Sequence, residues 1–266
     1  NGKGILFPNH QETAGSDPKS INSYAELQKD GYHIYGEKKW IANAAEASYF
    51  NVIVKDGSPD ADEMLMLLVD RDDPNFHIGE DKPRLGSNAM SCCDLRFEDC
   101  VVPEERLLSE DGLKEALRAI DVARVFTPAI SIGIAQRAID LTVDYLGDRV
   151  SFGEPIINSQ GVQWSLSELT AKIEAGRWLV YSTASQMDDN ADDKSVKAAM
   201  NKLYGTDIAM EATTKCLQHF GAKRYVKNSI LSNYMSLAKL LQIIDGTTQM
   251  QKFVISRALK KQAKGI

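Results

Sequence analysis

The 266-residue sequence predicts an α+β protein in which a small β-barrel or sandwich domain is followed by an antiparallel four-helix bundle. Two observations support this prediction. Up to about residue 108, apolar residues fall in short runs separated by turn-forming residues, a pattern typical of strands. Beyond that point they recur every three or four positions over long stretches, a pattern typical of amphipathic helices. The expected domains are therefore residues 1–108 and 109–266.

Four stretches of the first domain are rich in the aliphatic, β-branched and aromatic residues that strands favour. They are residues 33–41, 49–55, 64–70 and 94–102. The first of them alternates loosely, and we expect it to run around a turn. Clusters of glycine, aspartate, serine and proline, such as residues 56–60, separate the strands.

Helical periodicity extends over four long stretches that short loops can join, namely residues 113–146, 162–187, 195–220 and 231–244. Pro128 lies inside the first stretch and is expected to kink it. The acidic run 188–193 is expected to be a solvated loop, with Asp193 or Ser195 capping the next helix.

The last of these helical stretches ends at Asp245-Gly246, where glycine can adopt the positive φ that stops a helix. Thr248 stands three residues before Gln251, the spacing of a capping box, so the apolar helical pattern is expected to resume there. A carboxylate between two apolar helices is partly desolvated and suited to accepting a proton near neutral pH. The Asp-Gly pair is also a common turn signal, and spacing alone leaves both interpretations open.

Composition excludes several classes of function. The net charge of -6, with interspersed signs, argues against nucleic-acid binding, and no apolar run is long enough for a membrane span. The four cysteines lack metal-ligand spacing, and Cys92 and Cys93 are adjacent, so reduced thiols are expected. These features indicate a cytoplasmic protein, or one of the mitochondrial matrix if the source is eukaryotic.

Four motifs stand in order along the chain: Ala14-Gly15-Ser16-Asp17 with residues 36–43 (GEKKWIAN), residues 95–103 (LRFEDCVVP), residues 148–156 (DRVSFGEPI) with Gln160, and residues 244–249 (IDGTTQ). In this order and spacing they resemble the acyl-CoA dehydrogenase family, the flavin enzymes that desaturate acyl thioesters. The resemblance covers the family's middle β-domain and C-terminal helical domain. The family's N-terminal helical domain is missing from the sequence.

The resemblance implies FAD-dependent α,β-desaturation of an acyl-CoA or acyl-carrier thioester, with electrons passing to an electron-transfer flavoprotein. It also implies a homo- or hetero-oligomer, because residues from a facing subunit would complete the cofactor site. It places Asp245 where the family has its glutamate base. An aspartate reaches roughly 1–1.5 Å less far, so a cyclic or bulky acyl group that brings its proton closer is one interpretation.

The resemblance also assigns contacts to the other site residues. The expected FAD contacts are Trp40, Ile41, Ala42, Arg149, Ser151, Phe152, Gln160, Gln218, Gly221, Thr247 and Gln249. The expected substrate contacts are Ser16, Asp121, Arg124 and Gly246.

Several residues depart from the family's pattern. Ala42 replaces a threonine, Asn88 replaces a frequent arginine, and Ala222 and Arg224 replace glycines in a loop that approaches phosphate. These departures leave a second hypothesis open. In it, the chain is a non-catalytic or half-site partner subunit of a heteromeric acyl-CoA dehydrogenase.

Overall fold

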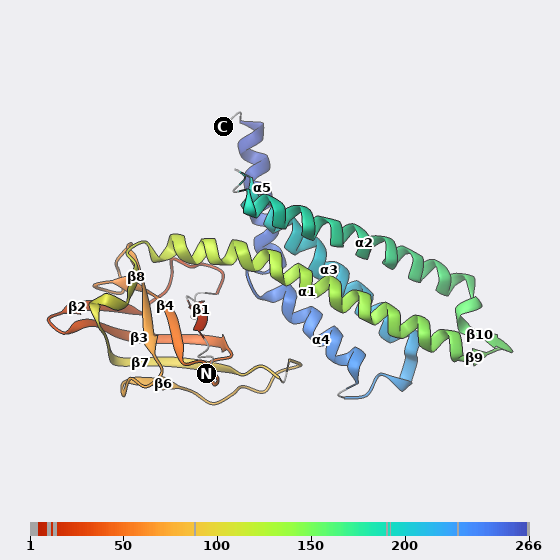
Figure 1. Ribbon diagram of the computed structural model, residues 1–266, viewed down its shortest axis with the longest axis horizontal. Helices are drawn as coiled ribbons and strands as arrows, with labels where there is room; N and C mark the ends of the chain where they lie inside the picture. The colour runs from red at the N-terminus through yellow and green to blue at the C-terminus, as the bar shows by residue number, and fades with distance from the viewer. Residues whose placement is uncertain are drawn as a thin grey trace. The chain divides into compact units, whose positions relative to one another are not determined.

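The computed structural model describes residues 5–9, 12, 15–87, 89–189, 191, 193–227 and 229–264. Ala14 and Asn88, which belong to the motifs and departures above, lie outside the described residues. The chain divides into two compact units, Asn1–Ala119 and Ile120–Ile266, and the division falls inside the first long helix. Figure 1 shows that strands dominate the first unit and helices the second.

The described part of the first unit holds one mixed sheet of eight strands. Neighbouring strands follow the order β6-β7-β3-β2-β4-β5-β8, and β1 pairs with β4. The strands are β1 (Ile5–Asn9), β2 (Tyr24–Gln28), β3 (Gly31–Ala42), β4 (Tyr49–Asp56), β5 (Met64–Asp70), β6 (Phe76–Ile78), β7 (Cys92–Val102) and β8 (Leu107–Ser109). The four expected strands are therefore confirmed.

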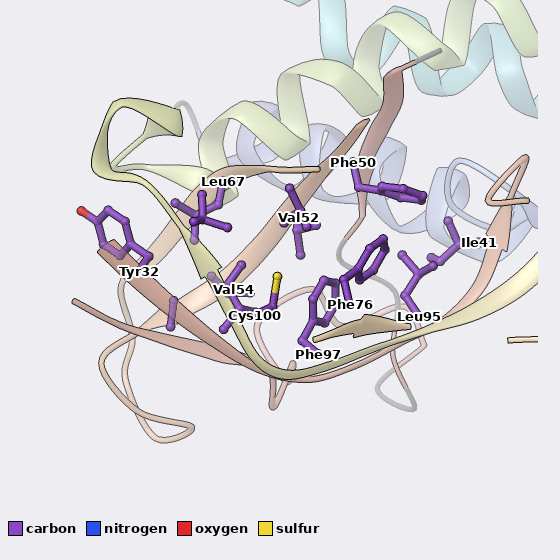
Figure 2. Packing of buried hydrophobic residues seen from close by; sticks show 14 of the residues in the cluster. Tyr32, Ile41, Phe50, Val52, Val54, Leu67, Phe76, Leu95, Phe97 and Cys100 are labelled. Atoms are coloured by element: carbon purple, nitrogen blue, oxygen red, sulfur yellow. The ribbon is translucent and has the colours of Figure 1, made fainter. Parts of the chain in front are cut away.

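The core of this unit forms because alternate residues of each strand point to the same face of the sheet. On β4 the side chains of Phe50, Val52 and Val54 are all fully buried. Figure 2 shows them facing the aromatic residues of β6 and β7, where Phe76 stacks on Phe97 with ring centroids 5.0 Å apart. The apolar period of two seen in the sequence thus becomes one continuous core.

The turn expected within residues 33–41 is wrong, because β3 runs unbroken from Gly31 to Ala42. Its pairing with β7 is irregular between Ile34 and Tyr35 and again between Lys38 and Ile41. Such irregularities bend a strand and shift its side chains without ending it. They explain why the sequence alternates only loosely there.

Five α-helices lie in the described part of the chain, and the α+β fold class is confirmed. They are α1 (Gly112–Asp148), α2 (Gln160–Asp188), α3 (Lys194–Phe220), α4 (Ile230–Ile243) and α5 (Thr248–Ala263). The first four correspond to the four expected helices, and α5 is the continuation expected after Gly246. Two short strands, β9 (Val150–Ser151) and β10 (Glu154–Pro155), connect α1 to α2.

The helices of the second unit pack in alternating directions. Lys172 of α2 pairs with Glu211 of α3 at 2.8 Å, whereas His219 near the end of α3 meets Ser165 near the start of α2, so these helices are antiparallel. Because α1 and α2 are also antiparallel (Figure 1), α1 and α3 run in the same direction.

Two expected helix caps are corrected by the structure. Thr247, and not Thr248, caps α5, since its Oγ1 accepts from the Met250 N–H at 3.3 Å. Asp193 stands at the cap position of α3 but makes no capping hydrogen bond. The hydroxyl of Ser195 instead donates to Asp121 on α1. The cap of α5 thus lies one residue earlier than expected, and Ser195 is engaged in a tertiary contact in place of a cap.

No helix in the described ranges combines the length and apolar character that crossing a bilayer requires. All four cysteines are buried and unpaired, so the expected reduced thiols are what the structure contains.

Candidate functional site

The turn between α4 and α5 presents the acidic residue that the sequence singled out. Helix α4 ends at Ile243, Ile244 is extended, and both Asp245 (φ 55°) and Gly246 (φ 86°) adopt the left-handed conformation. For a non-glycine residue this backbone conformation costs on the order of 1–3 kcal/mol and occurs preferentially at functional sites. The surrounding contacts must therefore hold Asp245 in place.

Donors from three helices hold the backbone of this turn. Lys202 of α3 donates through Nζ to the Gly246 carbonyl at 2.9 Å, and Gln251 of α5 donates to the same oxygen at 2.7 Å. Arg124 of α1 donates through Nε to the Asp245 carbonyl at 3.3 Å. Gly246 is required here, because a Cβ on it would lie 2.9 Å from the Gln251 amide nitrogen and 3.1 Å from an Arg124 nitrogen.

The Asp245 carboxylate is held separately from its backbone. Thr127 of α1, which is buried, donates its hydroxyl proton to Asp245 Oδ2 at 2.5 Å. Asp245 is partly buried as a residue. An ionised carboxylate with one oxygen bound and one available is a suitable proton acceptor.

Two buried cations lie beside this carboxylate. Burial lowers the pKa of Arg124, and the adjacent charge of Asp121 opposes that shift. Burial also lowers the pKa of Lys202 to about 8, opposed by the nearby charge of Asp245. Both cations donate hydrogen bonds to main-chain carbonyl oxygens of the turn that carries Asp245.

Asp121 and Arg124, both expected at the substrate, belong to the same cluster. Arg124 Nη1 lies 3.0 Å from Asp121 Oδ1, and the other oxygen of Asp121 accepts from Ser195. The structure thus brings Asp121, Arg124, Asp245 and Gly246 together at one end of the bundle.

Thr247 and Gln249, expected at the cofactor, follow this turn directly. Thr247 caps α5 and is half-buried, whereas Gln249 is exposed in the first turn of the helix. Both residues are therefore placed at the same end of the bundle as Asp245.

The first unit carries the expected flavin wall. Trp40 lies at the irregularity between β3 and β7, has a positive φ of 60°, and exposes more than half of its side chain. The main-chain N–H of Trp40 donates to Asp94 Oδ1 at 3.1 Å, and Lys82 Nζ lies 4.9 Å from the centroid of the Trp40 ring. A large aromatic ring held outward by a strained backbone is suited to cover a flat heteroaromatic ring.

The neighbouring expected contacts of this unit differ in exposure. The Ile41 side chain is buried in the sheet core, which leaves its backbone as the group that can reach a cofactor. Ala42 is exposed at the end of β3, and Ser16 is exposed in a turn that precedes β2.

The remaining expected cofactor residues gather at the opposite end of the bundle from Asp245. Figure 1 shows β9 and β10 at that end, beyond the last turn of α1. The stack of Tyr145 on Phe220, with centroids 4.3 Å apart, brings the ends of α1 and α3 side by side there. The exposed or partly exposed residues at this end are Arg149, Ser151, Phe152, Gln160, Gln218 and Gly221.

The distance between the two ends follows from helix geometry. Arg124 lies 24 positions before Asp148, the last residue of α1, which at 1.5 Å per residue is about 36 Å. Guanidinium and amide groups at the far end are suited to phosphate oxygens, whereas the near end offers a carboxylate. The expected cofactor residues of the second unit are thus split between two distant places.

The sequence analysis missed two residues of the cluster, Thr127 and Lys202. Lys202 shares the buried face of α3 with Ala198, Gly205 and Ala209, at helical spacing. A lysine among small buried residues was the available signal, because it requires a buried acceptor. Thr127 follows Arg124 by three positions and so lies on the same face of α1.

A β-sheet unit followed by a helical bundle, with a carboxylate at a helix junction, is the arrangement that the motifs predicted. Residues 110–260 match the C-terminal domain of acyl-CoA dehydrogenases, and residues 11–100 match their middle domain. The chain therefore belongs to the acyl-CoA dehydrogenase family.

Three proteins illustrate the similarity. A probable acyl-CoA dehydrogenase of Mycobacterium tuberculosis is 35% identical over 252 residues, covering 94% of this chain and 65% of that protein. The cyclohexane-1-carbonyl-CoA dehydrogenase of Geobacter metallireducens is 32% identical, covering 94% of this chain and 66% of that protein. The structure of butyryl-CoA dehydrogenase from Megasphaera elsdenii superposes with a TM-score of 0.92 at 30% identity, covering 97% of this chain and 68% of that one. The chain thus spans about two thirds of the length of these relatives.

Proposed function

We propose that the protein is an FAD-dependent acyl-CoA dehydrogenase that introduces an α,β double bond into an acyl thioester, with Asp245 as the base. The observation that carries the proposal is the Asp245 turn. An acidic residue with a left-handed backbone lies between two helices, and one of its carboxylate oxygens accepts a hydrogen bond from the buried Thr127. A carboxylate held in a fixed position is the geometry that a proton-accepting base requires.

In the proposed reaction, Asp245 takes a proton from the α-carbon of the thioester. When bound, FAD would accept the hydride from the β-carbon. The residues fit this cofactor. Trp40 offers an exposed aromatic wall in the first unit, and Arg149 is free to meet phosphate oxygens at the far end of the second.

We further propose that a second subunit completes the cofactor site. The end of α1, which Arg149 follows, lies about 36 Å along the helix from Arg124 beside the Asp245 turn, a distance too long for a single bound cofactor to bridge. The far end of one chain is therefore expected to serve the site of its neighbour, in a homo- or hetero-oligomer. The electrons are expected to pass on to an electron-transfer flavoprotein.

The acyl group is proposed to be attached to CoA, as in the names of the relatives. The cyclohexane-1-carbonyl-CoA dehydrogenase relative is named for a cyclic acyl group. Such a group fits the shorter reach of Asp245, because a ring carbon that bears the α-proton can project it toward the base. Turnover of cyclohexane-1-carbonyl-CoA against butyryl-CoA measures this preference.

The replacement Asp245→Asn tests the base. It keeps the size of the side chain but removes its basicity, so turnover of these two thioesters with an artificial electron acceptor should fall by roughly 10³-fold or more. The visible flavin spectrum should remain. Asp140→Asn is the matched control, since Asp140 is an exposed carboxylate on α1 that accepts from Gln136 at 2.8 Å. Full activity in Asp245→Asn would refute the assignment.

The rival hypothesis is a non-catalytic partner subunit, and the altered glycine loop is the observation that favours it. Ala222 replaces a glycine there, while Lys223 and Arg224 lie over the rings of Tyr145 and Phe220. Purifying the protein alone separates the two hypotheses. Bound flavin gives a yellow protein with visible absorbance, whereas a partner with half a site would be colourless until mixed with another subunit.

A further inference from the structure

The contacts around Asp245 separate into those that hold its backbone and one that holds its carboxylate. Lys202, Gln251 and Arg124 all donate to main-chain carbonyl oxygens of the turn. Thr127 alone, among the hydrogen bonds found in the described residues, donates to the Asp245 carboxylate. Removing the Thr127 hydroxyl should therefore change the carboxylate while leaving the turn in place.

The position of Thr127 is itself fixed by its helix. The residue is 4% exposed and is followed by Pro128, and its main-chain carbonyl accepts from the Ser131 hydroxyl at 2.8 Å. A β-branched side chain in a helix has few allowed rotamers, so its hydroxyl points in a defined direction. At 2.5 Å from Asp245 Oδ2, that hydroxyl selects one rotamer of the aspartate.

We propose that Thr127 is a positioning residue for Asp245, holding Oδ2 so that Oδ1 is the oxygen presented to the α-proton. The inference rests on the proposed function of Asp245 as base. Its physical basis is that a short side chain must be oriented closely, since a misplacement of about 1 Å can cost 10²-fold in rate.

Replacing Thr127 by valine removes the hydroxyl and keeps the shape of the side chain. We expect kcat to fall by about 10–100-fold with KM within about threefold of the original value. Thr127→Ser restores a hydroxyl and should keep kcat within about threefold of the original protein.

Thr142→Val is the matched control. Thr142 is a fully buried threonine of the same helix whose hydroxyl donates to the Ala138 carbonyl at 2.7 Å, away from Asp245. This variant should lose stability comparably while keeping the kcat and the KM of the original protein. A purely structural role for Thr127 would make the two valine variants behave alike.

The assays use the purified protein with butyryl-CoA and cyclohexane-1-carbonyl-CoA as probes. Three results would overturn the role of Thr127 alone: an unchanged kcat in Thr127→Val, a kcat that rises, or a Thr127→Ser variant as slow as the valine variant. The proposed function fails as well if the original protein turns over neither probe, or if the Asp245→Asn variant turns them over as fast as the original protein. The two failures are thus distinguishable.

Discussion

Replacing Lys38 by methionine should destabilise the first unit by about 3–5 kcal/mol, the usual cost of removing one partner of a buried ion pair. Lys38 Nζ lies 2.8 Å from Glu12 Oε1, with side-chain exposures of 0% and 6%. Ser23 donates its hydroxyl proton to the same Glu12 oxygen. In the variant, the Glu12 carboxylate would keep its burial but lose its cation.

The loss of stability in Lys38→Met should depend on pH. Burial alone would raise the pKa of Glu12, but Lys38 and the hydrogen bonds to the carboxylate lower it. In the original protein, Glu12 therefore contributes stability above its unfolded pKa, and this stability is lost as pH falls through the folded value. Without Lys38, burial raises the pKa of Glu12, and protonation of Glu12 removes the cost of a buried, unpaired charge. The difference in stability between the two proteins should then shrink from about pH 7 to about pH 4.5.

Urea denaturation followed by circular dichroism measures the free energy of unfolding of both proteins at the two pH values. The double variant Lys38→Met/Glu12→Gln is the control, because it removes the unpaired charge and should be more stable than Lys38→Met alone. A loss below about 1 kcal/mol in Lys38→Met would show that solvent reaches the pair and would refute the reasoning. A double variant no more stable than the single one would do the same.

Two further predictions concern the turn and a histidine. Gly246→Ala should lower the free energy of unfolding by about 1–3 kcal/mol and lower activity, because the φ of Gly246 is 86° and the new Cβ would crowd the Gln251 amide. The control Gly133→Ala, on the exposed face of α1, should be neutral or stabilising. Thermal unfolding compares the two variants. Hydrogen bonds that the His33 ring donates to the carboxylates of Asp30 and Asp99 raise the pKa of His33, so its contribution to stability is present below the unfolded pKa and is lost as pH rises through the folded value. His33→Gln should therefore lower the melting temperature more at about pH 5.5 than at about pH 9, and an equal loss at both values would contradict the assignment.

The strands and helices could be predicted largely from the sequence because their burial is periodic. On β4 every second residue from Phe50 to Val54 is buried, and the long helices carry apolar faces at helical spacing. The end of α4 just before Asp245-Gly246 could be predicted for a similar reason, since glycine adopts a positive φ more readily than other residues. The course of β3 could not, because its irregular pairing depends on a partner strand about sixty residues away.

The sequence by itself determined which residue types stand in which local elements, and it placed Asp245 at the break between two helices. Only the tertiary structure decided what surrounds that carboxylate. Thr127 is 118 residues from Asp245 in the sequence, and Lys202 is 44 residues from Gly246, so no local pattern could pair them. The physical reason is that a helix leaves its side chains free to meet any neighbour, and packing of the bundle selects which groups become hydrogen-bond partners.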